Sequence, residues 1–380
     1  MPHQEDFGVE QFMNEYETGI AHNMAETCCY SLSLNEVCKI SGEKFNIDLN
    51  TRLTYGAIEG SDVLRTLIAS SYGEEFTKEN VLVTNGAIAA NFLLYYALVN
   101  PGDHVISVAP TYSQLSSVPS MFGADVELIH LKEEEDFNIN VESLKSMVKP
   151  NTKLLILNNP NNPLGKLMST ETLSEISALC NENGIYLHCD EVYRPLFHSL
   201  PLDMSPAESI CRVYENGIST GSMSKAYSAA GIRVGWIVSK NLDVLKTALS
   251  RRDYNTISVS KIDDMIAQYL LRNRESVLKR NYLLCQKNLK VLNDFIKSNS
   301  DKFAFVTTPQ AGCVCLVRPI GINNTEKFAR YLAEEWKTLA LPGELFGIPN
   351  ALRIGYGNSE EDLLTGLPIL KNAYDKWMSQ

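Results

Sequence analysis

Short apolar runs rich in β-branched residues alternate with helix-like patterns between about residues 75 and 240. Six of these runs have the composition of strands: 81–84, 104–109, 126–131, 153–157, 185–189 and 234–238. Turn-forming residues separate them, for example the Asn-Pro-Gly-Asp stretch at 100–103. Strands that alternate with helices pair mainly in parallel. The pattern therefore predicts an α/β fold with a mostly parallel central sheet flanked by helices.

The pattern of apolar and polar residues changes after residue 240. Longer amphipathic patterns predict helices at 261–271, 274–297, 325–337 and 360–378, with strands at 303–307, 313–318 and 351–356 between them. These elements predict a smaller α+β domain. We expect three parts: an N-terminal segment, 1–45, that packs on the small domain; a large domain, 46–260; and the small domain, 261–380.

Charge and composition exclude several classes of protein. The chain of 380 residues has 34 Lys and Arg against 45 Asp and Glu, a net charge of −11 that repels a nucleic-acid backbone. No apolar stretch approaches the roughly 20 residues that cross a bilayer, and the polar, acidic start lacks a signal-peptide pattern, so we expect a cytoplasmic protein with no membrane partner. The nine cysteines form no C-x-x-C pair and the six histidines no H-x-x-x-H pair, so we expect reduced thiols and no metal site.

The most informative stretch is STGSMSKAY at 219–227, followed by GIRVGW at 231–236. Lys225 lies on a loop of small residues just after a strand, and this spacing can present its amine beside a dianion held by a hydroxyl and a guanidinium. The stretch resembles the cofactor-lysine motif of the fold-type I pyridoxal-phosphate enzymes, the class I/II aminotransferase family. The resemblance implies that Lys225 forms a Schiff base with the cofactor and that Ser222 and Arg233 bind its phosphate.

A second motif, NNPNNPLG at 158–165, follows a predicted strand. It resembles the family's N-P-x-N-P-T-G, which implies that Asn162 hydrogen-bonds the phenolic oxygen of the cofactor. Leu164 stands where the family usually has Thr, so a side-chain hydroxyl is lost at this position.

A third motif, CDEVY at 189–193, closes the predicted strand 185–189. The family match implies that Asp190 binds the pyridine nitrogen and that Tyr193 binds the phenolic oxygen. A carboxylate keeps that nitrogen protonated, which makes the ring an electron sink. His188 should share the face of Asp190, where it either tunes the carboxylate or is a satisfied core histidine.

Two stretches near the start of the large domain complete the expected cofactor site. The backbone of Gly86, Ala87 and Ile88 joins a strand to a helix, and the free N–H groups of a first helical turn suit a phosphate. The stretch APTY at 109–112 resembles the family's P-x-Y, which implies that Tyr112 stacks on the pyridine ring.

Two more motifs concern the substrate and the partner subunit. The stretch LRIG at 352–355 resembles the family strand whose Arg, here Arg353, binds the substrate α-carboxylate in bidentate geometry. The stretch that begins at Tyr55 resembles the family's Y-x-x-x-x-G-x-x-x-L-R. This implies that Tyr55 reaches the phosphate of a neighbouring subunit, and therefore a homodimer.

The sequence does not define which residues bind the substrate side chain. Plausible walls are the N-terminal segment with Glu26, and Tyr254; Glu26 either pairs with a cationic substrate or is a solvated or capping residue. The leading hypothesis is an aminotransferase that moves the amino group of a small L-amino acid to a 2-oxo acid. The alternatives are a cyclase, lyase or oxidase on an arginine-like amino acid, because residues 252–260 also resemble the capreomycidine synthase branch, and a cofactor-binding regulator that has lost catalysis.

Overall fold

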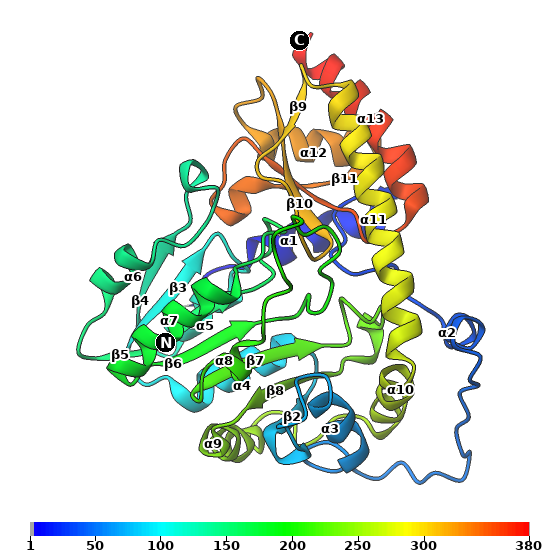
Figure 1. Ribbon diagram of the computed structural model, residues 1–380. Coiled ribbons are helices and arrows are strands. Elements are labelled where there is room, and N and C mark those ends of the chain that lie inside the picture. The colour runs from blue at the N-terminus through cyan, green and yellow to red at the C-terminus, as the bar shows by residue number, and fades with distance from the viewer. Residues whose placement is uncertain (1–3, 380) are drawn as a thin grey trace.

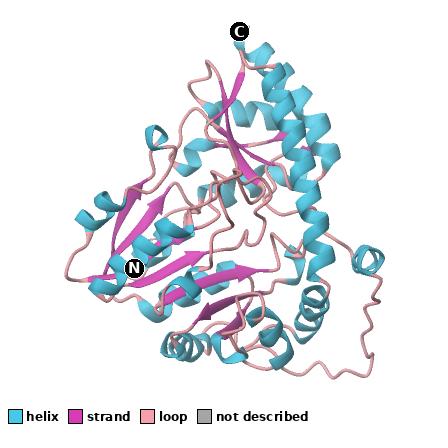
Figure 2. Ribbon diagram, viewed as in Figure 1, coloured by secondary structure: helices cyan, strands magenta, loops and turns pink. Residues whose placement is uncertain are grey.

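A seven-stranded sheet forms the centre of the larger part of the molecule, for which a computed structural model describes residues 4–379 (Figures 1 and 2). The strand order is β2-β8-β7-β6-β5-β3-β4. The strands are β2 (Val81–Thr84), β3 (His104–Ala109), β4 (Asp125–His130), β5 (Thr152–Asn158), β6 (Tyr186–Asp190), β7 (Gly217–Ser222) and β8 (Gly235–Ser239). Neighbours among β3 to β7 pair in parallel, and β8 is antiparallel to β7 and β2. The predicted mostly parallel sheet is confirmed.

Helices cover both faces of this sheet (Figure 1). Apolar residues of α4 (Ala87–Leu98), α5 (Gln114–Met121) and α9 (Leu242–Arg252) form one core against the strands. Those of α6 (Val141–Met147), α7 (Thr170–Asn183) and α8 (Ile210–Val213) form another core. Because the sheet is buried on both faces, most of its strands are nearly continuous apolar runs, and such runs can be recognised in the sequence.

A smaller antiparallel sheet lies on the other side of the molecule, in the order β12-β13-β10-β9. Its strands are β9 (Phe303–Phe305), β10 (Val314–Pro319), β12 (Leu341–Pro342) and β13 (Leu352–Gly355), and its helices are α11 (Arg274–Ser298), α12 (Thr325–Trp336) and α13 (Glu360–Met378). Figure 1 shows α11 running from α10 (Lys261–Arg272), beside the large sheet, up to the small one. The predicted helices and strands of this region match these elements to within two residues at each end.

The N-terminal segment contacts the small sheet's side of the molecule. It contains α1 (Gly8–Tyr16) and β1 (His22–Asn23), which pairs in parallel with β11 (Thr338–Leu339). Arg330 of α12 donates hydrogen bonds to Glu15 and Tyr16 at the end of α1. The remaining elements are α2 (Leu34–Ser41), α3 (Asp62–Ala69) and five short 3₁₀ helices: 17–19, 78–80, 133–135, 230–232 and 343–346. The three-part division of the chain stays a proposal. No helix in the described residues has both the length and the apolar character of a membrane span.

Strand β7 is absent from the six apolar runs that the sequence pattern singled out. Its sequence, GISTGS, has too few apolar residues to form such a run, yet every residue of the strand is buried. The small residues are required: a Cβ at Gly221 would lie 2.5 Å from Nε1 of Trp236, on the neighbouring strand β8. That ring in turn donates a 2.8 Å hydrogen bond to the hydroxyl of Tyr72.

We expect Gly221→Ala to lower the free energy of unfolding by about 1–3 kcal/mol, because the added methyl group displaces the Trp236 ring from its hydrogen bond. Urea unfolding followed by circular dichroism measures the change. Gly19→Ala is the matched control, since a Cβ at Gly19 meets nothing within 4 Å. Equal stability of the two variants would contradict the packing argument.

Candidate active site

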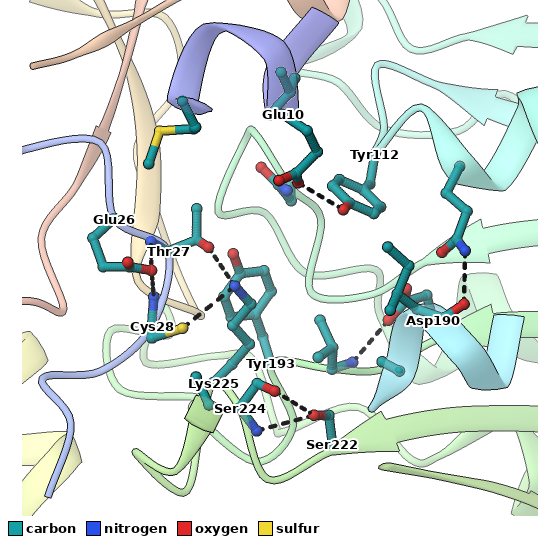
Figure 3. A pocket seen from close by; sticks show the side chains of 18 of the residues that line it. Glu10, Glu26, Thr27, Cys28, Tyr112, Asp190, Tyr193, Ser222, Ser224 and Lys225 are labelled. Carbon is teal, nitrogen blue, oxygen red and sulfur yellow. Dashed lines mark hydrogen bonds between the residues drawn. The ribbon is translucent and has the colours of Figure 1, made fainter. Parts of the chain in front are cut away.

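The site is a cavity of about 390 Å³ between the large sheet and β13 (Figure 3). The carboxyl ends of three adjacent parallel strands reach it: Asn158 of β5, Asp190 of β6 and Ser222 of β7. Arg353 of β13 enters from the opposite side, and residues of α1 line a further wall. Strand ends that share one edge of a parallel sheet are the usual place for a ligand in such folds. The predicted site residues therefore converge from distant parts of the sequence.

Lys225 presents its amine to the interior of this cavity (Figure 3). Nζ donates a hydrogen bond to Oγ1 of Thr27 and lies 3.5 Å from Sγ of Cys28. Burial acts to lower the pKa of Lys225, but the neighbouring Cys28 and Glu26 act in the opposite sense, and the pKa lies above its ordinary value. Burial also raises the pKa of the Cys28 thiol to about 12, so that this thiol stays protonated.

An anion pocket lies at the start of α4. Ser222 Oγ accepts a 2.9 Å hydrogen bond from the backbone N–H of Ser224, and Nη1 of Arg233 lies 3.4 Å from Oγ of Ser224. A Cβ at Gly86 would stand 2.6 Å from Nη2 of Arg233, so only glycine allows the helix start this close to the guanidinium. No side chain in the described residues caps this helix start. Its free N–H groups, the hydroxyls and the guanidinium suit a phosphate.

The backbone at the helix start faces the same pocket, since both Ala87 and Ile88 line the cavity. Ile88 is held in place by Gln114, whose amide donates a 2.7 Å hydrogen bond to its carbonyl. Ser224 also lines the cavity, although the motif assigned the phosphate only to Ser222 and Arg233.

Asp190 is a buried carboxylate with neutral hydrogen-bond donors. Oδ2 accepts a 2.9 Å bond from Nδ2 of Asn91, and Oδ1 accepts a 3.0 Å bond from the backbone N–H of Val192. Burial raises the pKa of Asp190, and the hydrogen bonds from Asn91 and Val192 offset this only in part. A cation at the cavity side of Asp190 would stabilise its charged form. A protonated pyridine nitrogen fits this requirement.

His188 is connected to Asp190 through two intervening side chains. Thr220 Oγ1 donates to Oδ1 of Asn91 at 2.7 Å, and Nε2 of His188 lies 2.9 Å from the same Thr220 oxygen. Nδ1 of His188 lies 3.0 Å from the hydroxyl of Tyr95. Burial lowers the pKa of His188 to about 3, so the ring is neutral. Both interpretations from the sequence therefore apply, because His188 is a satisfied core histidine that also orients the amide which holds Asp190.

No motif pointed to Asn91. Its position could have been a signal, since Asn91 is the only residue with a side-chain amide in the mainly apolar helix 87–98. A buried amide in an apolar helix needs polar partners, and here the strand ends provide them.

Two buried polar groups face the cavity without a partner. Oη of Tyr193 and Nε of Arg353 accept or donate no hydrogen bond within residues 4–379. The remaining nitrogens of Arg353 are held: Nη1 donates to Oδ1 of Asn162 at 3.3 Å, and Nη2 donates to the carbonyl of Ala25 at 3.0 Å. Buried polar groups are normally paired. A ligand with a phenolic oxygen near Tyr193 and a carboxylate near Arg353 would satisfy both.

Tyr112 forms the wall beside α1. Its ring centroid lies 4.8 Å from that of Phe7, and its hydroxyl donates a 2.8 Å hydrogen bond to Oε1 of Glu10 (Figure 3). In the N-terminal segment, the sequence pointed to Glu26 as part of the wall but not to Glu10. Its contact depends on the tertiary position of α1, for which the sequence carries no motif.

Four further positions singled out in the sequence do not line this cavity: Gly86, which directly precedes the lining Ala87, and Tyr55, Tyr254 and Leu164. Tyr55, in the segment between α2 and α3, and Tyr254, after α9, are each 78% exposed. The structure does not bring them to the site of their own chain. Leu164 is fully buried in an apolar core, where its side chain replaces the polar contact of a Thr with packing.

The fold and the site together define a class of protein, the fold-type I pyridoxal-phosphate enzymes. The sequence profile of the family described as aminotransferase class I and II matches residues 32–367. The chain belongs to this family and is a pyridoxal-phosphate-dependent aminotransferase.

Known proteins of similar sequence and structure agree with this assignment. The chain is 29% identical over 322 residues to an aspartate aminotransferase of Streptomyces avermitilis, covering 80% of this chain and 76% of that one. It is 26% identical over 290 residues to a capreomycidine synthase of Streptomyces vinaceus, covering 76% and 73%. A solved pyridoxal-phosphate-dependent aminotransferase from Streptococcus suis superposes with a TM-score of 0.91 at 32% identity, covering 98% of each chain.

We expect Asn91→Ala to weaken cofactor binding about tenfold or more, because the Asn91 amide is a donor to a buried charge. Loss of this donor raises the pKa of Asp190 further, so that less of its charged form pairs with the ring nitrogen. Absorbance titration of the apoenzyme with pyridoxal phosphate measures the dissociation constant. Asn138→Ala, on the exposed surface, is the control. Unaltered affinity in Asn91→Ala would show that the amide does not support Asp190.

Proposed function

We propose that this enzyme transfers the amino group of a small-molecule L-amino acid to a 2-oxo acid, with Lys225 as the covalent anchor of the cofactor aldehyde. The observation that carries the proposal is the position of Lys225 Nζ. It lies in the same cavity as the anion pocket of Ser222 and Arg233, the buried carboxylate of Asp190 and Arg353, whose Nε has no hydrogen-bond partner among the described residues.

The bound cofactor supplies a carbonyl carbon for the substrate amine and a ring that delocalises the electron pair left when the Cα proton departs. Asp190 would stabilise a positive charge at the ring nitrogen. Tyr193 and Asn162 would bind the phenolic oxygen, and Tyr112 would stack on the ring. Ser222, Arg233 and the backbone at 86–88 would hold the phosphate.

The substrate is oriented from the other side of the cavity. Arg353 binds its α-carboxylate, and its guanidinium is itself fixed by Asn162 and by the carbonyl of Ala25. Fixing the carboxylate would direct the Cα–H bond toward the amine of Lys225, which would take that proton and return it. The overall reaction converts one amino acid and one 2-oxo acid into the 2-oxo acid of the first and the amino acid of the second.

A second candidate is a cyclase, lyase or oxidase on the same scaffold. The likeness to a capreomycidine synthase supports it, and the same residues would remove the Cα proton. The reactions differ after this proton has left, because only transamination requires a 2-oxo acid acceptor.

We further propose that the enzyme acts as a homodimer in the cytoplasm, with Tyr55 completing the phosphate pocket of the partner subunit. The segment around Tyr55 extends away from the rest of the chain (Figure 1) and exposes 92% of Leu49 and 81% of Leu53. Apolar side chains exposed together favour a protein partner. The nine cysteines are all free, which is usual in a reducing compartment.

Lys225→Ala should remove the covalent link. We expect the purified wild-type enzyme to carry a yellow chromophore that borohydride fixes to the protein, and the variant to carry none after reduction and denaturation. Mass spectrometry of the intact protein measures the adduct.

In the wild type, conversion of amino acids should require an added 2-oxo acid for continued turnover. Multiple turnovers without any acceptor would reject transamination in favour of the second candidate.

Mixing two inactive variants tests the role of Tyr55. If Tyr55 serves the partner's site, a hybrid dimer of Tyr55→Ala and Arg233→Ala has one intact site and one doubly altered site. Random exchange of subunits should therefore restore about a quarter of the wild-type sites. Transamination activity of the refolded mixture, with each variant alone as control, measures this. If Tyr55 serves its own chain or no site, mixing restores nothing.

A further inference from the structure

Besides Asp190, three carboxylates line the active-site cavity, and none of them takes part in the proposed reaction. Glu10 lies on α1, Glu17 follows it, and Glu26 lies on the segment after β1; all three line the cavity. The cations that line it are Lys225, Arg233 and Arg353. Each of these already has a task, with the cofactor or with the α-carboxylate. Among the described lining residues, the part of the cavity left for the substrate side chain thus carries negative charge only.

Glu26 is held rigidly in this part of the cavity. Its Oε1 accepts hydrogen bonds from the backbone N–H groups of Thr27, at 2.6 Å, and Cys28, at 2.9 Å. Burial acts to raise the pKa of Glu26, but the charge of Lys225 and these hydrogen bonds outweigh it, so the pKa lies below its ordinary value. Glu26 therefore caps the backbone N–H groups of Thr27 and Cys28, which was one of the two roles considered for it, and its charged carboxylate remains in the cavity wall.

The backbone at Glu26 is fixed against the strand that carries Arg353. Gly355 N–H donates a 2.8 Å hydrogen bond to the carbonyl of Met24, and a Cβ at Gly355 would stand 1.7 Å from the carbonyl oxygen of Glu26. Arg353 itself binds the carbonyl of Ala25. The anionic wall and the guanidinium therefore keep a constant separation, as two recognition points for one ligand require.

The charges of Glu26 and Glu10 act on Glu17. The pKa of Glu17 is raised, first by burial and then by the charges of Glu26 and Glu10. Like charges gathered in a partly buried site repel, and a cation placed among them removes this repulsion. An independent sign of a ligand comes from the opposite end of the same cavity, where Nε of Arg353, a residue that is 2% exposed, has no hydrogen-bond partner in the part of the chain that the structure describes.

We propose that the substrate is an amino acid with a cationic side chain, an ammonium or a guanidinium, whose charge is bound by Glu26 and Glu17 with Glu10 nearby. The proposal rests on the proposed function, because it takes Arg353 as the binding site of the α-carboxylate. A dicarboxylic amino acid would place its second carboxylate among three others. It would need a further guanidinium, and the described lining residues offer none that is free of another task.

The first experiment compares substrates that differ only in side-chain charge. The holoenzyme is mixed with L-ornithine, L-norvaline, L-aspartate or L-glutamate, and the change of cofactor absorption is followed through one half-reaction. Norvaline is ornithine without the terminal amine. We expect kcat/KM for ornithine to exceed that for norvaline about tenfold or more, and the dicarboxylic acids to be the poorest, since charged hydrogen bonds to a buried partner give differences of this size.

The second experiment measures binding without turnover. Calorimetry of the holoenzyme with 2-methylornithine and 2-methylnorvaline, which have no Cα proton, gives the ratio of their dissociation constants. We expect Glu26→Gln to reduce the preference for 2-methylornithine about tenfold, and Glu17→Gln to reduce it by less because Glu17 is more exposed. Glu134→Gln, which removes an exposed charge outside the cavity, should keep the wild-type ratio.

The outcomes separate the two proposals. If no amino acid of any charge changes the cofactor absorption, the proposed function itself is wrong. If norvaline or the dicarboxylic acids react better than ornithine, the enzyme is an aminotransferase but its cationic specificity is rejected. The specificity is also rejected if Glu26→Gln keeps the wild-type preference for 2-methylornithine.

Discussion

The site depends on the burial of one negative charge. Asp190 stands at the end of a central strand, out of reach of bulk water, and such a charge is tolerated only where donors surround it. Asn91 provides a donor from α4, and Thr220 on β7 and His188 on β6 fix the orientation of that amide. One carboxylate thus couples a helix to two strands of the large sheet. The same helix begins at the anion pocket, so α4 contributes both to that pocket and to the support of Asp190.

The second half of the site comes from the smaller sheet and the N-terminal segment. Arg353 on β13 binds the carbonyl of Ala25, and α1 is joined to α12 through Arg330. On the side of the large sheet, Tyr112 contacts this segment through one hydrogen bond to Glu10 of α1 and one aromatic contact with Phe7, which precedes the helix. The residues proposed to hold the cofactor therefore belong mainly to one side of the cavity, and Arg353, proposed to bind the substrate, belongs to the other.

The sequence predicts the elements of this molecule better than the contacts between them. Strand β3 begins and ends at the predicted residues, because a sheet buried on both faces demands a continuous apolar run. Lys225, Asp190 and Arg353 were visible because each is the functional residue of a motif at the end of a strand or within one. Asn91 and Glu10 were not, since their importance comes from partners more than 90 residues away. Strand β7 was not predicted for a related reason. The Trp236 ring leaves no room for a side chain at Gly221, and this contact exists only in the folded sheet. The role of Tyr55 requires a second chain and stays a prediction, whereas Tyr254, expected in the pocket wall, lies outside the cavity of its own chain.

The close approach of Gly355 to the carbonyl of Glu26 has a consequence for how such an enzyme changes over evolution. Because the main chain at position 26 is clamped, the residue type there can be exchanged while the grip on the α-carboxylate stays intact. Recognition of the part common to all amino acids is separated from recognition of the variable part. A new preference could arise from a single codon, which makes position 26 the natural starting point for redesigning the enzyme.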